Sequence, residues 1–522
     1  MAPSGCLKGL FLIKEEDTDV IVVGGGGSGL AAAIEARTLS RRVVLLEKNP
    51  KLGGSTAWSV GSISATNTPH QIRMGIQDRP EDHFEDLGLF CKKTGLPDNL
   101  ALRRILIDNV SDTFRWLISM GVVFHGPLQQ APHRKPRMHN VLPNSRAYIY
   151  HLGRHARRIG VDIRTESRVH ELMVEDGVVV GVVYRQGETV HRLRAQGGVV
   201  LASGDFGGNA TMRENYISKA VSLARPINPT NTGDGHKLVE ALGGKILNQK
   251  HHLAGVRFAP PPEKWILKIP PYAWVTRCIS WSLENMPSWL LRPFVMSFLT
   301  TVLQSSPELY RQGAVLINRD GCRFNDELGD PARHLPDQPK GEAFILLDGR
   351  LVDLFSKPPF HISTAPGIAY GYIDDYRRSR KDIFYQADDL RGLAKRLGMD
   401  AEKLSKTVDE YNQNLSSQAT EVSNRGERSP LSGGPWVALG PVSYYITFTD
   451  SGVATNELHQ VLAADGQPVV GLFAAGFIGM GGMLLEGLGH HLGWAFTSGR
   501  RAGRHAAFRV VTPDVSAHDK NT

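Results

Sequence analysis

Cysteine is scarce in this chain of 522 residues, which has only Cys6, Cys91, Cys278 and Cys322. No pair among them shows the CxxC or metal-ligand spacing that marks a redox or zinc motif. This pattern excludes a disulfide framework and predicts no metal site. We expect free thiols in a reducing compartment, which indicates a cytoplasmic protein.

Long apolar runs and blocks of basic residues are also missing. The apolar patch at Leu7–Ile13 is interrupted by Lys8 and is too short for a secretory signal. The formal net charge is +8, but the densest basic cluster, "YRRSRKD" at 376–382, is typical of a solvated helix face. We therefore expect no nucleic-acid partner, while a peripheral contact with an anionic membrane surface stays open.

Glycine, by contrast, is abundant, with 55 residues, and its first cluster falls in a recognisable pattern. "TDVIVVG" (18–24) is a short apolar run rich in β-branched residues, which predicts a buried parallel strand. "LAAAIEARTL" (30–39) has helical spacing, and "RRVVLLEK" (41–48) predicts a second strand. The glycines between the first strand and the helix are spaced G-x-G-x-x-G, and Glu47 ends the second strand 18 residues after Gly29. This is the βαβ fingerprint of a dinucleotide-binding site.

Each residue of the fingerprint has a physical role in that interpretation. Gly24 permits the tight turn, Gly26 lets the backbone approach a pyrophosphate, and Gly29 lets the helix pack closely on the strand. The helix start presents unpaired N–H groups to the phosphates. The carboxylate of Glu47 is predicted to accept hydrogen bonds from ribose hydroxyls.

Four later segments narrow the choice of dinucleotide. They are "KLGGSTAWSVGS" (51–62), "GGVVLASGDFGGN" (197–209), "NTGDGHKL" (231–238) and "GLFAAGFIGMGGMLLEGLGHHLGWAFTSGRRAG" (471–503). Together with the fingerprint they resemble the FAD-dependent fumarate reductase and 3-ketosteroid dehydrogenase superfamily, in order and over nearly the whole chain. The resemblance implies an α/β fold, with a Rossmann-like FAD-binding domain and an inserted α+β cap that binds the substrate.

The resemblance also implies a set of FAD contacts. Val169 is expected to contact adenine through its backbone, Asp234 to lie near the flavin, and Gly476 to lie beside the ribityl chain. Members with covalent flavin carry a His near the first Gly-Gly motif, where this chain has Ser55, so the FAD is predicted to be non-covalent. The full predicted FAD site comprises Gly24, Gly26, Gly27, Ser28, Gly29, Glu47, Lys48, Gly53, Gly54, Ser55, Thr56, Val169, Gly204, Asp234, Gly476, Gly489 and Leu492.

The expected domain plan follows from these motifs and from changes in composition. We predict an N-terminal tail (1–16), a first part of the FAD-binding domain (17–250), a cap (251–433), a second part of the FAD-binding domain (434–512) and a C-terminal tail (513–522). Half of the eight tryptophans, Trp265, Trp274, Trp281 and Trp289, fall in the first part of the cap. This Trp-rich insert is interpreted as a helical core element, a substrate lid or a membrane-touching surface.

The cap also carries the stretch "GAVLINRDGCRFNDE" (313–327), which matches the family form G-A-x-L-x-N-x-x-G-x-R-F-x-x-E. In fumarate reductases a proton-donating Arg follows this stretch by a few residues, but Pro331 stands there in this chain and Arg333 comes two residues later. The family's C-terminal H-G-x-N-R segment is absent as well. We therefore do not expect a dicarboxylate reductase.

The C-terminal glycines favour the ketosteroid branch instead. In that branch a Tyr is followed by glycines two, four and eight residues on, and here Leu485 is followed by Gly487, Gly489 and Gly493. Gly489 thereby inherits the position whose N–H would hold a developing oxyanion, a contact worth about 3 kcal/mol of barrier. The alternative is that these glycines only let the backbone pass close to the flavin.

Neither activating Tyr of the ketosteroid enzymes is at its family position, so other residues are candidates for acid–base chemistry. His490 and His491 follow Gly489 at the start of a predicted helix, which favours a neutral imidazole that can act as a base. The alternative is that one of these histidines caps the helix and the other packs in the interface. In the cap, Tyr370 lies in "FHISTAPGIAYGY" (360–372). The predicted catalytic set is Gly489, His490, His491 and Tyr370.

The sequence thus predicts an FAD-dependent dehydrogenase or reductase that acts on CH–CH bonds. The preferred reaction is 1,2-desaturation next to a carbonyl of an apolar, possibly cyclic or steroid-like substrate. One alternative is the reduction of an activated C=C bond, and a second is a non-catalytic flavin-binding or electron-transfer protein. The residues do not identify the external electron acceptor.

Overall fold

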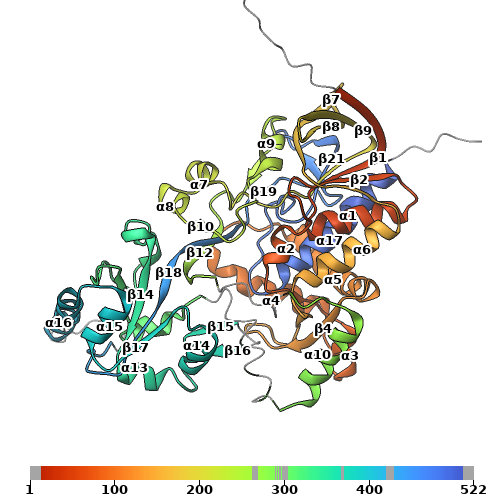
Figure 1. The fold of residues 1–522 in the computed structure, drawn as a ribbon. Coiled ribbons are helices and arrows are strands. Elements are labelled where there is room, and N and C mark those ends of the chain that lie inside the picture. Colours follow the sequence, from red (N-terminus) through yellow and green to blue (C-terminus); the bar gives the residue numbers. More distant parts are fainter. Residues whose placement is uncertain are drawn as a thin grey trace, which may run out of the picture.

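The computed structural model describes residues 13–260, 268–287, 290, 292, 296, 304–365, 369–418 and 428–509. Two lobes make up this part of the chain, and Figure 1 shows them side by side. The larger lobe contains the glycine fingerprint and both ends of the described chain. The smaller lobe, the cap, is formed by the middle of the chain, and β18 reaches from it towards the larger lobe.

The central sheet of the larger lobe has the strand order β20-β21-β9-β1-β2-β6, with β7 and β8 added through β9. The sheet is parallel from β21 through β9, β1 and β2 to β6. The edge strand β20 pairs with β21 in the antiparallel direction. Their bounds are β1 Ile13–Val23, β2 Val43–Leu46, β6 Asp162–Arg164, β7 Ser167–Glu175, β8 Val178–Gln186, β9 Thr189–Leu201, β20 Gln460–Leu462 and β21 Pro468–Ala474. The predicted parallel strands are confirmed. Residues 161–204 also have the pattern of short strands with a turn at Asp176 and Gly177, which predicts an antiparallel meander, and β7, β8 and β9 confirm it.

Helices cover one face of this sheet and enclose its main core. Helix α1 (Gly27–Thr38) packs on α17 (His490–Phe508) and α6 (Arg146–Arg158), and α17 packs on α5 (Leu100–Ser119). Buried alanines, leucines and valines of these helices form one continuous cluster. The opposite face is covered by the β7–β8 hairpin and α9 (Asp234–Glu240), which enclose a second cluster.

Smaller elements complete the larger lobe. A three-stranded sheet has the order β3-β5-β4. The bounds are α2 Gly54–Trp58, β3 Ser62–Ser64, α3 Pro69–Arg73, α4 Pro80–Cys91, β4 Val123–Leu128, β5 Met138–Leu142, α7 Ala210–Tyr216, α8 Lys219–Ser222, β11 Ile246–Leu247 and β19 Gly452–Val453.

The cap is built on a sheet of order β10-β18-β14-β13, in which β12 and β17 also pair with β18. Its strands are β10 Arg225–Pro226, β12 His252–Phe258, β13 Val315–Asn318, β14 Ala343–Leu347, β17 Phe384–Ala387 and β18 Trp436–Thr449. Around it lie α12 Pro307–Arg311, α13 Gly349–Leu354, β15 Ser363–Ala365, β16 Ala369–Gly371, α14 Ile373–Ser379, α15 Leu390–Leu397 and α16 Ala401–Gln418. The segment "DAEKLSKTVDEYNQNL" (400–415) has apolar residues at helical spacing, which predicts an amphipathic helix. This helix is confirmed in α16, which buries Leu404, Val408 and Tyr411.

Two expected boundaries differ from the structure. Strand β1 begins at Ile13, four residues before the expected start of the FAD-binding domain at residue 17, because residues 13–18 pair with β9. The chain returns to the larger lobe near Asp450 rather than at residue 434, because β18 is the central strand of the cap sheet. The pattern of "GAVLINRDGCRFNDE" (313–327) predicts a strand, a turn and a second strand, but the second strand is reduced to a single bridge between Ile317 and Arg323.

The Trp-rich insert is described only in part. Helix α10 (Ala273–Asn285) buries Thr276 and leaves Trp274 and Trp281 more than half exposed. Trp265 and Trp289 lie outside the described residues. None of the helices in the described ranges is both long and apolar enough to cross a bilayer.

Candidate functional site

A cavity of about 500 Å³ lies between the two lobes. The larger lobe contributes the glycine fingerprint, the segment from Gly54 to Ser62 and the segment from Glu486 to Leu492. The cap and the connections to it contribute Ile227, Leu253, Arg257, Gln304, Thr447 and Phe448. All of the predicted FAD-site residues line this cavity except Gly29 and Gly53.

The glycine loop has the close packing that a bound pyrophosphate needs. A Cβ on Gly24 would lie 2.4 Å from the carbonyl oxygen of Ala202, and one on Gly29 would lie 1.8 Å from the carbonyl oxygen of Gly24. Helix α1 begins at Gly27, and its N-cap residue, Gly26, has no side chain to close the helix end. The helix N-terminus therefore faces the cavity as an anion-binding group, which fits the diphosphate of FAD.

The adenosine end of the cavity is marked by charged side chains. Glu47 accepts hydrogen bonds from the backbone N–H groups of Gly25 (2.7 Å) and Asn49 (2.8 Å). Lys48 Nζ donates to Asp234 Oδ2 at 2.8 Å, and Arg168 donates to Asp234 Oδ1 at 2.9 Å. These bonds hold Asp234 beside Lys48 and the strand that carries Val169, the residue predicted to contact adenine, while its expected place near the flavin stays a prediction. Helix α9, which begins at Asp234, packs against β7, the strand that carries Arg168 and Val169.

A buried polar cluster supports Ser55 at the expected flavin. The hydroxyl of Ser55 accepts hydrogen bonds from Asn228 Nδ2 (3.0 Å) and Asn231 Nδ2 (2.8 Å). Asn231 in turn donates to Asp205, which also accepts from the N–H of Thr449 at 2.7 Å. Burial raises the pKa of Asp205 to about 6. Sequence reasoning missed this cluster, because its members come from four segments that are far apart in the sequence: α2, the segment after β9, the segment before α9 and the end of β18.

The loop before α17 forms the wall of the cavity at its flavin end. Gly489 is the N-cap of α17 and has φ +92°. A Cβ at this position would lie 2.4 Å from the backbone nitrogen of Ser64 in β3. Glycine is therefore required here by the backbone conformation and by close packing on β3, whatever its N–H does in the reaction. This packing on β3 is a different reason for glycine from the alternative left open by the sequence, in which the glycines let the backbone pass close to the flavin.

The two adjacent histidines at the start of α17 point to different places. His491 lines the cavity, whereas His490 is buried behind it. The Nε2 atoms of His490 and His83 are 3.1 Å apart, and the ring of His133 lies 5.3 Å from both rings. Burial lowers the pKa of His490 well below its ordinary value. The prediction that His490 acts on a substrate is not supported, because its ring contacts other side chains and not the cavity.

Tyr370 is also away from the cavity. It lies in β16 of the cap, is 47% exposed and packs against the ring of His361. Gly53 and Gly29 do not line the cavity: a Cβ on Gly53 would contact Ala57 at 3.4 Å, and Gly29 packs against Gly24. Of the four predicted catalytic residues, the structure thus brings Gly489 and His491 to the cavity.

His491 belongs to a network of charged groups at the junction of the lobes. Its Nε2 lies 2.9 Å from Asp450 Oδ1, and the other oxygen of this buried carboxylate lies 3.1 Å from His251 Nδ1. The second ring nitrogen of His251 lies 3.2 Å from Glu486, which lines the cavity. Burial alone would lower the pKa of His251, but Asp450 and Glu486 outweigh it and raise the pKa to about 9.

This raised pKa gives a prediction for stability. A histidine whose folded-state pKa exceeds its unfolded value of about 6.5 stabilises the fold fully below that value and loses this contribution as the pH rises through the folded pKa. His251→Gln should therefore lower the melting temperature most below pH 6.5, and the difference from the parent should shrink up to about pH 9. Thermal unfolding of both proteins across this range tests it. A difference that is independent of pH would mean that His251 contributes only packing.

The cap contributes Arg257, a cation that sequence reasoning did not single out. Leu253, Gly255 and Arg257 alternate along β12, so they share one face of the strand. Arg257 lines the cavity and is 9% exposed. Burial lowers its pKa to about 10, so the guanidinium is still a cation at neutral pH. The period-two pattern of "HLAGVRF" was the signal that could have placed it on the cavity face.

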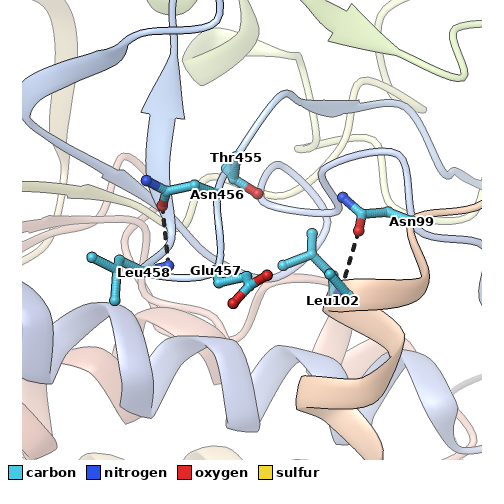
Figure 2. A pocket seen from close by; sticks show the side chains of 7 residues that line it. Asn99, Leu102, Thr455, Asn456, Glu457 and Leu458 are labelled. Carbon is cyan, nitrogen blue, oxygen red and sulfur yellow. Dashed lines mark hydrogen bonds between the residues drawn. The ribbon is translucent and has the colours of Figure 1, made fainter.

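A second pocket of about 300 Å³ lies elsewhere, between the start of α5 and the segment from Thr455 to Leu458 (Figure 2). It shares no lining residue with the large cavity. Asn99 Oδ1 accepts from Leu102 N at the helix start, and Asn456 Oδ1 accepts from Leu458 N in a turn. These side chains serve local structure, so the pocket is not a second site of chemistry.

Comparison with known proteins agrees with this site. The family model described as "FAD binding domain" matches residues 19–262 and 294–484. The probable fumarate reductase Ifc3 of Shewanella frigidimarina is 28% identical over 503 residues, which cover 94% of this chain and 75% of that protein. The urocanate reductase of Eggerthella lenta is 25% identical, with 94% of this chain and 75% of the relative covered. The open conformation of a flavocytochrome c3 fumarate reductase has a TM-score of 0.72 and 26% identity, and covers 95% of this chain and 79% of its own.

These relatives correct the preference for the ketosteroid branch. A 3-ketosteroid-Δ4-(5α)-dehydrogenase from Rhodococcus jostii RHA1 has a TM-score of 0.59 and 23% identity, and covers 94% of this chain and 97% of its own. That likeness shows the shared fold alone, whereas the fumarate reductases are more similar in both sequence and structure. The chain belongs to the FAD-binding flavoprotein family of oxidoreductases that act on CH–CH bonds.

Proposed function

We propose that this protein reduces a carbon–carbon double bond that is activated by a carboxylate or carbonyl group. The observation that carries the proposal is the buried Arg257, which faces the FAD cavity from the cap. A cation in a water-poor site attracts the electron-rich oxygen of an activating group. Reductases that act on fumarate and urocanate among the relatives support this direction of reaction.

When bound and reduced, FAD supplies a hydride to a carbon placed over its ring. The chain's own task is to place the alkene and to stabilise the charge that develops. Arg257 would hold the carboxylate or carbonyl of the substrate, where negative charge grows as the hydride arrives. Gly255, one position along the same face of β12, lets Gln304 pack close beside this anchor, since a Cβ there would lie 2.9 Å from Gln304 Nε2.

The lining of the cavity argues against a small diacid as the substrate. Pro331 occupies the position of the family's proton-donating Arg, and Arg333 is 59% exposed, pairs with Asp330 and does not line the cavity. On the cap side, Ile227, Leu253 and Phe448 are apolar. We infer an apolar alkene with a single anionic or carbonyl group.

A substrate panel tests the proposal. Anaerobic, chemically reduced enzyme is mixed with an aryl-substituted unsaturated acid, an unsaturated ketone, fumarate and an unactivated alkene. We expect the absorbance of oxidised flavin to return with the aryl-substituted unsaturated acid and with the unsaturated ketone. We expect little return with the unactivated alkene. Oxidised enzyme is mixed with the matching saturated ketones in parallel. Flavin reduction by a ketone would favour desaturation instead, and no response to any compound would favour a non-catalytic flavoprotein.

We also propose that the FAD is held without a covalent bond. Ser55 lines the cavity where covalent members of the superfamily carry a His, and its hydroxyl is engaged by Asn228 and Asn231. Acid precipitation should release all of the yellow colour as FAD into the supernatant. Flavin that stays with the precipitated protein would contradict this, and FMN in the supernatant would contradict the dinucleotide.

A peripheral membrane contact through α10 is a further proposal, supported by the exposure of Trp274 (69%) and Trp281 (62%). Replacing both by Ser should abolish co-sedimentation with anionic vesicles and leave the FAD content unchanged, because α10 buries little. Loss of FAD-loaded protein would favour core packing instead. Equal sedimentation of parent and variant would exclude the contact.

A further inference from the structure

We propose that His491 donates the proton that completes reduction of the substrate, and that Asp450 and His251 hold it ready as positioning residues. The inference rests on the proposed function and adds the proton donor to it. Hydride transfer to one carbon of the double bond leaves an electron pair on the other, which needs a proton from a group in the cavity. Neither the family's Arg nor a family Tyr is present to supply it.

The position of His491 suits this role. It lies in the first turn of α17 and lines the cavity, beside Gly489 at the expected flavin ring. Its Nε2 is directed to Asp450, so Nδ1 is the nitrogen left to act on a substrate. The rings of Phe448 and Phe477 pack on it at 4.5 and 5.2 Å and hold its orientation. Both phenylalanines also line the cavity, so the donor and the apolar surface lie together.

Asp450 supplies a negative charge beside the ring of His491, which favours the proposed cationic form in the protein interior. Its carboxylate is fully buried and lies between two imidazoles, those of His491 and His251. Burial alone would raise the pKa of Asp450, but the two histidines outweigh it and hold the pKa below its ordinary value. An ionised carboxylate bonded to one ring nitrogen fixes the ring and stabilises the imidazolium, as in catalytic triads.

His251 keeps the charge balanced when His491 has given its proton away. With a carboxylate at each ring nitrogen, His251 is held as a cation between Asp450 and Glu486. The buried Asp450 therefore faces a positive charge before and after the transfer, and need not take up a proton itself. The other titratable ring next to His491 is that of His490, which burial keeps neutral by lowering its pKa.

The Nδ1–H bond of the His491 imidazolium breaks and its electron pair stays on Nδ1. The proton forms a C–H bond with the electron pair that hydride addition left on the second carbon. The imidazole becomes neutral with Nε2–H still donated to Asp450, and it regains a proton from water once the product leaves. The two electrons come from the reduced flavin. In the test, an external reductant such as dithionite supplies these electrons to the flavin.

A metal ion is the rival interpretation, because ligand atoms of His251, Asp450 and Glu486 lie within 4.8 Å of one another. The distances favour the network of ion pairs, since the two ring nitrogens of His251 lie 3.1 and 3.2 Å from carboxylate oxygens of Asp450 and Glu486. A chelator therefore belongs in the test. Activity that is lost on chelation and restored by a divalent metal would overturn the proposal in favour of a metal centre.

The experiment uses the holoenzyme and the variants His491→Gln, Asp450→Asn and His251→Gln. The control is His252→Gln, whose ring bonds to the carbonyl of Lys250 and does not line the cavity. Anaerobically reduced proteins are mixed with an unsaturated ketone in D₂O, and flavin reoxidation and the stereochemistry of deuterium in the product are followed. We expect a 10²- to 10⁴-fold slower reaction for His491→Gln and about 10²-fold for Asp450→Asn, the range for lost general-acid catalysis. The His491 variant should also yield mixed stereoisomers at the protonated carbon, because water then delivers the proton.

A second readout needs no substrate. In ¹³C-histidine-labelled holoenzyme, the His251 resonance, identified by its loss in His251→Gln, should titrate with a pKa of about 9 and shift towards 6.5 in Asp450→Asn. No shift in the variant would overturn the network, whatever the substrate. If the parent reduces alkenes while His491→Gln and Asp450→Asn match it in rate and stereochemistry, the proton donor is wrong and the proposed function stands. If the parent reduces none, the proposed function fails, and the titration alone decides on the network.

Discussion

Replacing Arg257 by Met should slow alkene reduction about 10²- to 10³-fold while the protein keeps its FAD, because one buried donor to a developing oxyanion is removed. Arg257 faces the cavity from the cap strand β12, whereas the FAD contacts come from the larger lobe. The loss should therefore fall on the chemical step with the substrate and not on flavin content. Stopped-flow reoxidation of the reduced variant by an unsaturated ketone measures it.

Two further variants keep this prediction decisive. Arg257→Lys retains the charge but not the planar fork of donors, so it should recover only part of the rate. Arg333→Met is the matched control, because that side chain is exposed and pairs with Asp330. Equal rates for Arg257→Met and the parent would remove Arg257 from the mechanism. Equal losses at positions 257 and 333 would indicate a general effect on the cap.

Gly29→Ala should yield protein that lacks FAD. The added methyl would lie 1.8 Å from the carbonyl oxygen of Gly24, an atom of the backbone that has no freedom to move aside. Helix α1 would have to separate from β1, and its N-terminus would leave the position that binds the diphosphate. The flavin-to-protein absorbance ratio of the purified variant measures the effect.

Gly153→Ala in α6 is the control for this substitution. A methyl there makes only ordinary contacts, of 3.4 Å with Leu52 and 3.5 Å with Arg157, and alanine is the better helix former. This variant should keep the FAD content and the stability of the parent. A full complement of FAD in Gly29→Ala would show that the loop binds the cofactor in another way.

The sequence was sufficient for the parts of the fold that depend on local pattern. The βαβ fingerprint lies within 31 residues, 18 to 48, where apolar spacing and glycine positions together determine strand, turn and helix. The amphipathic spacing of Leu404, Val408 and Tyr411 likewise predicted α16 and its buried face. Boundaries were less certain, because β18 looks like an ordinary strand from its sequence and is the centre of the cap sheet only through long-range pairing.

The arrangement of the candidate site could not be predicted from local sequence patterns. His490 and His491 are neighbours at the start of one helix, and only the packing of α17 decides which of them faces the cavity. Asp450 and His251 come from chain segments far apart in the sequence, so no local spacing joins them to His491. The glycine pattern suggested the ketosteroid branch, yet Gly487 packs against Phe90 and Gly489 against β3. The shared spacing therefore reflects backbone packing, which does not identify a substrate.

The central claim is that the cavity brings reduced FAD and an activated alkene together. A single-turnover experiment tests it most directly: anaerobic, photoreduced enzyme is mixed with one equivalent of an aryl-substituted unsaturated ketone, and flavin absorbance and product are measured together. We expect one equivalent of oxidised flavin to appear together with one equivalent of the saturated ketone. Flavin that stays reduced while the alkene is recovered unchanged, across the whole panel, would contradict it.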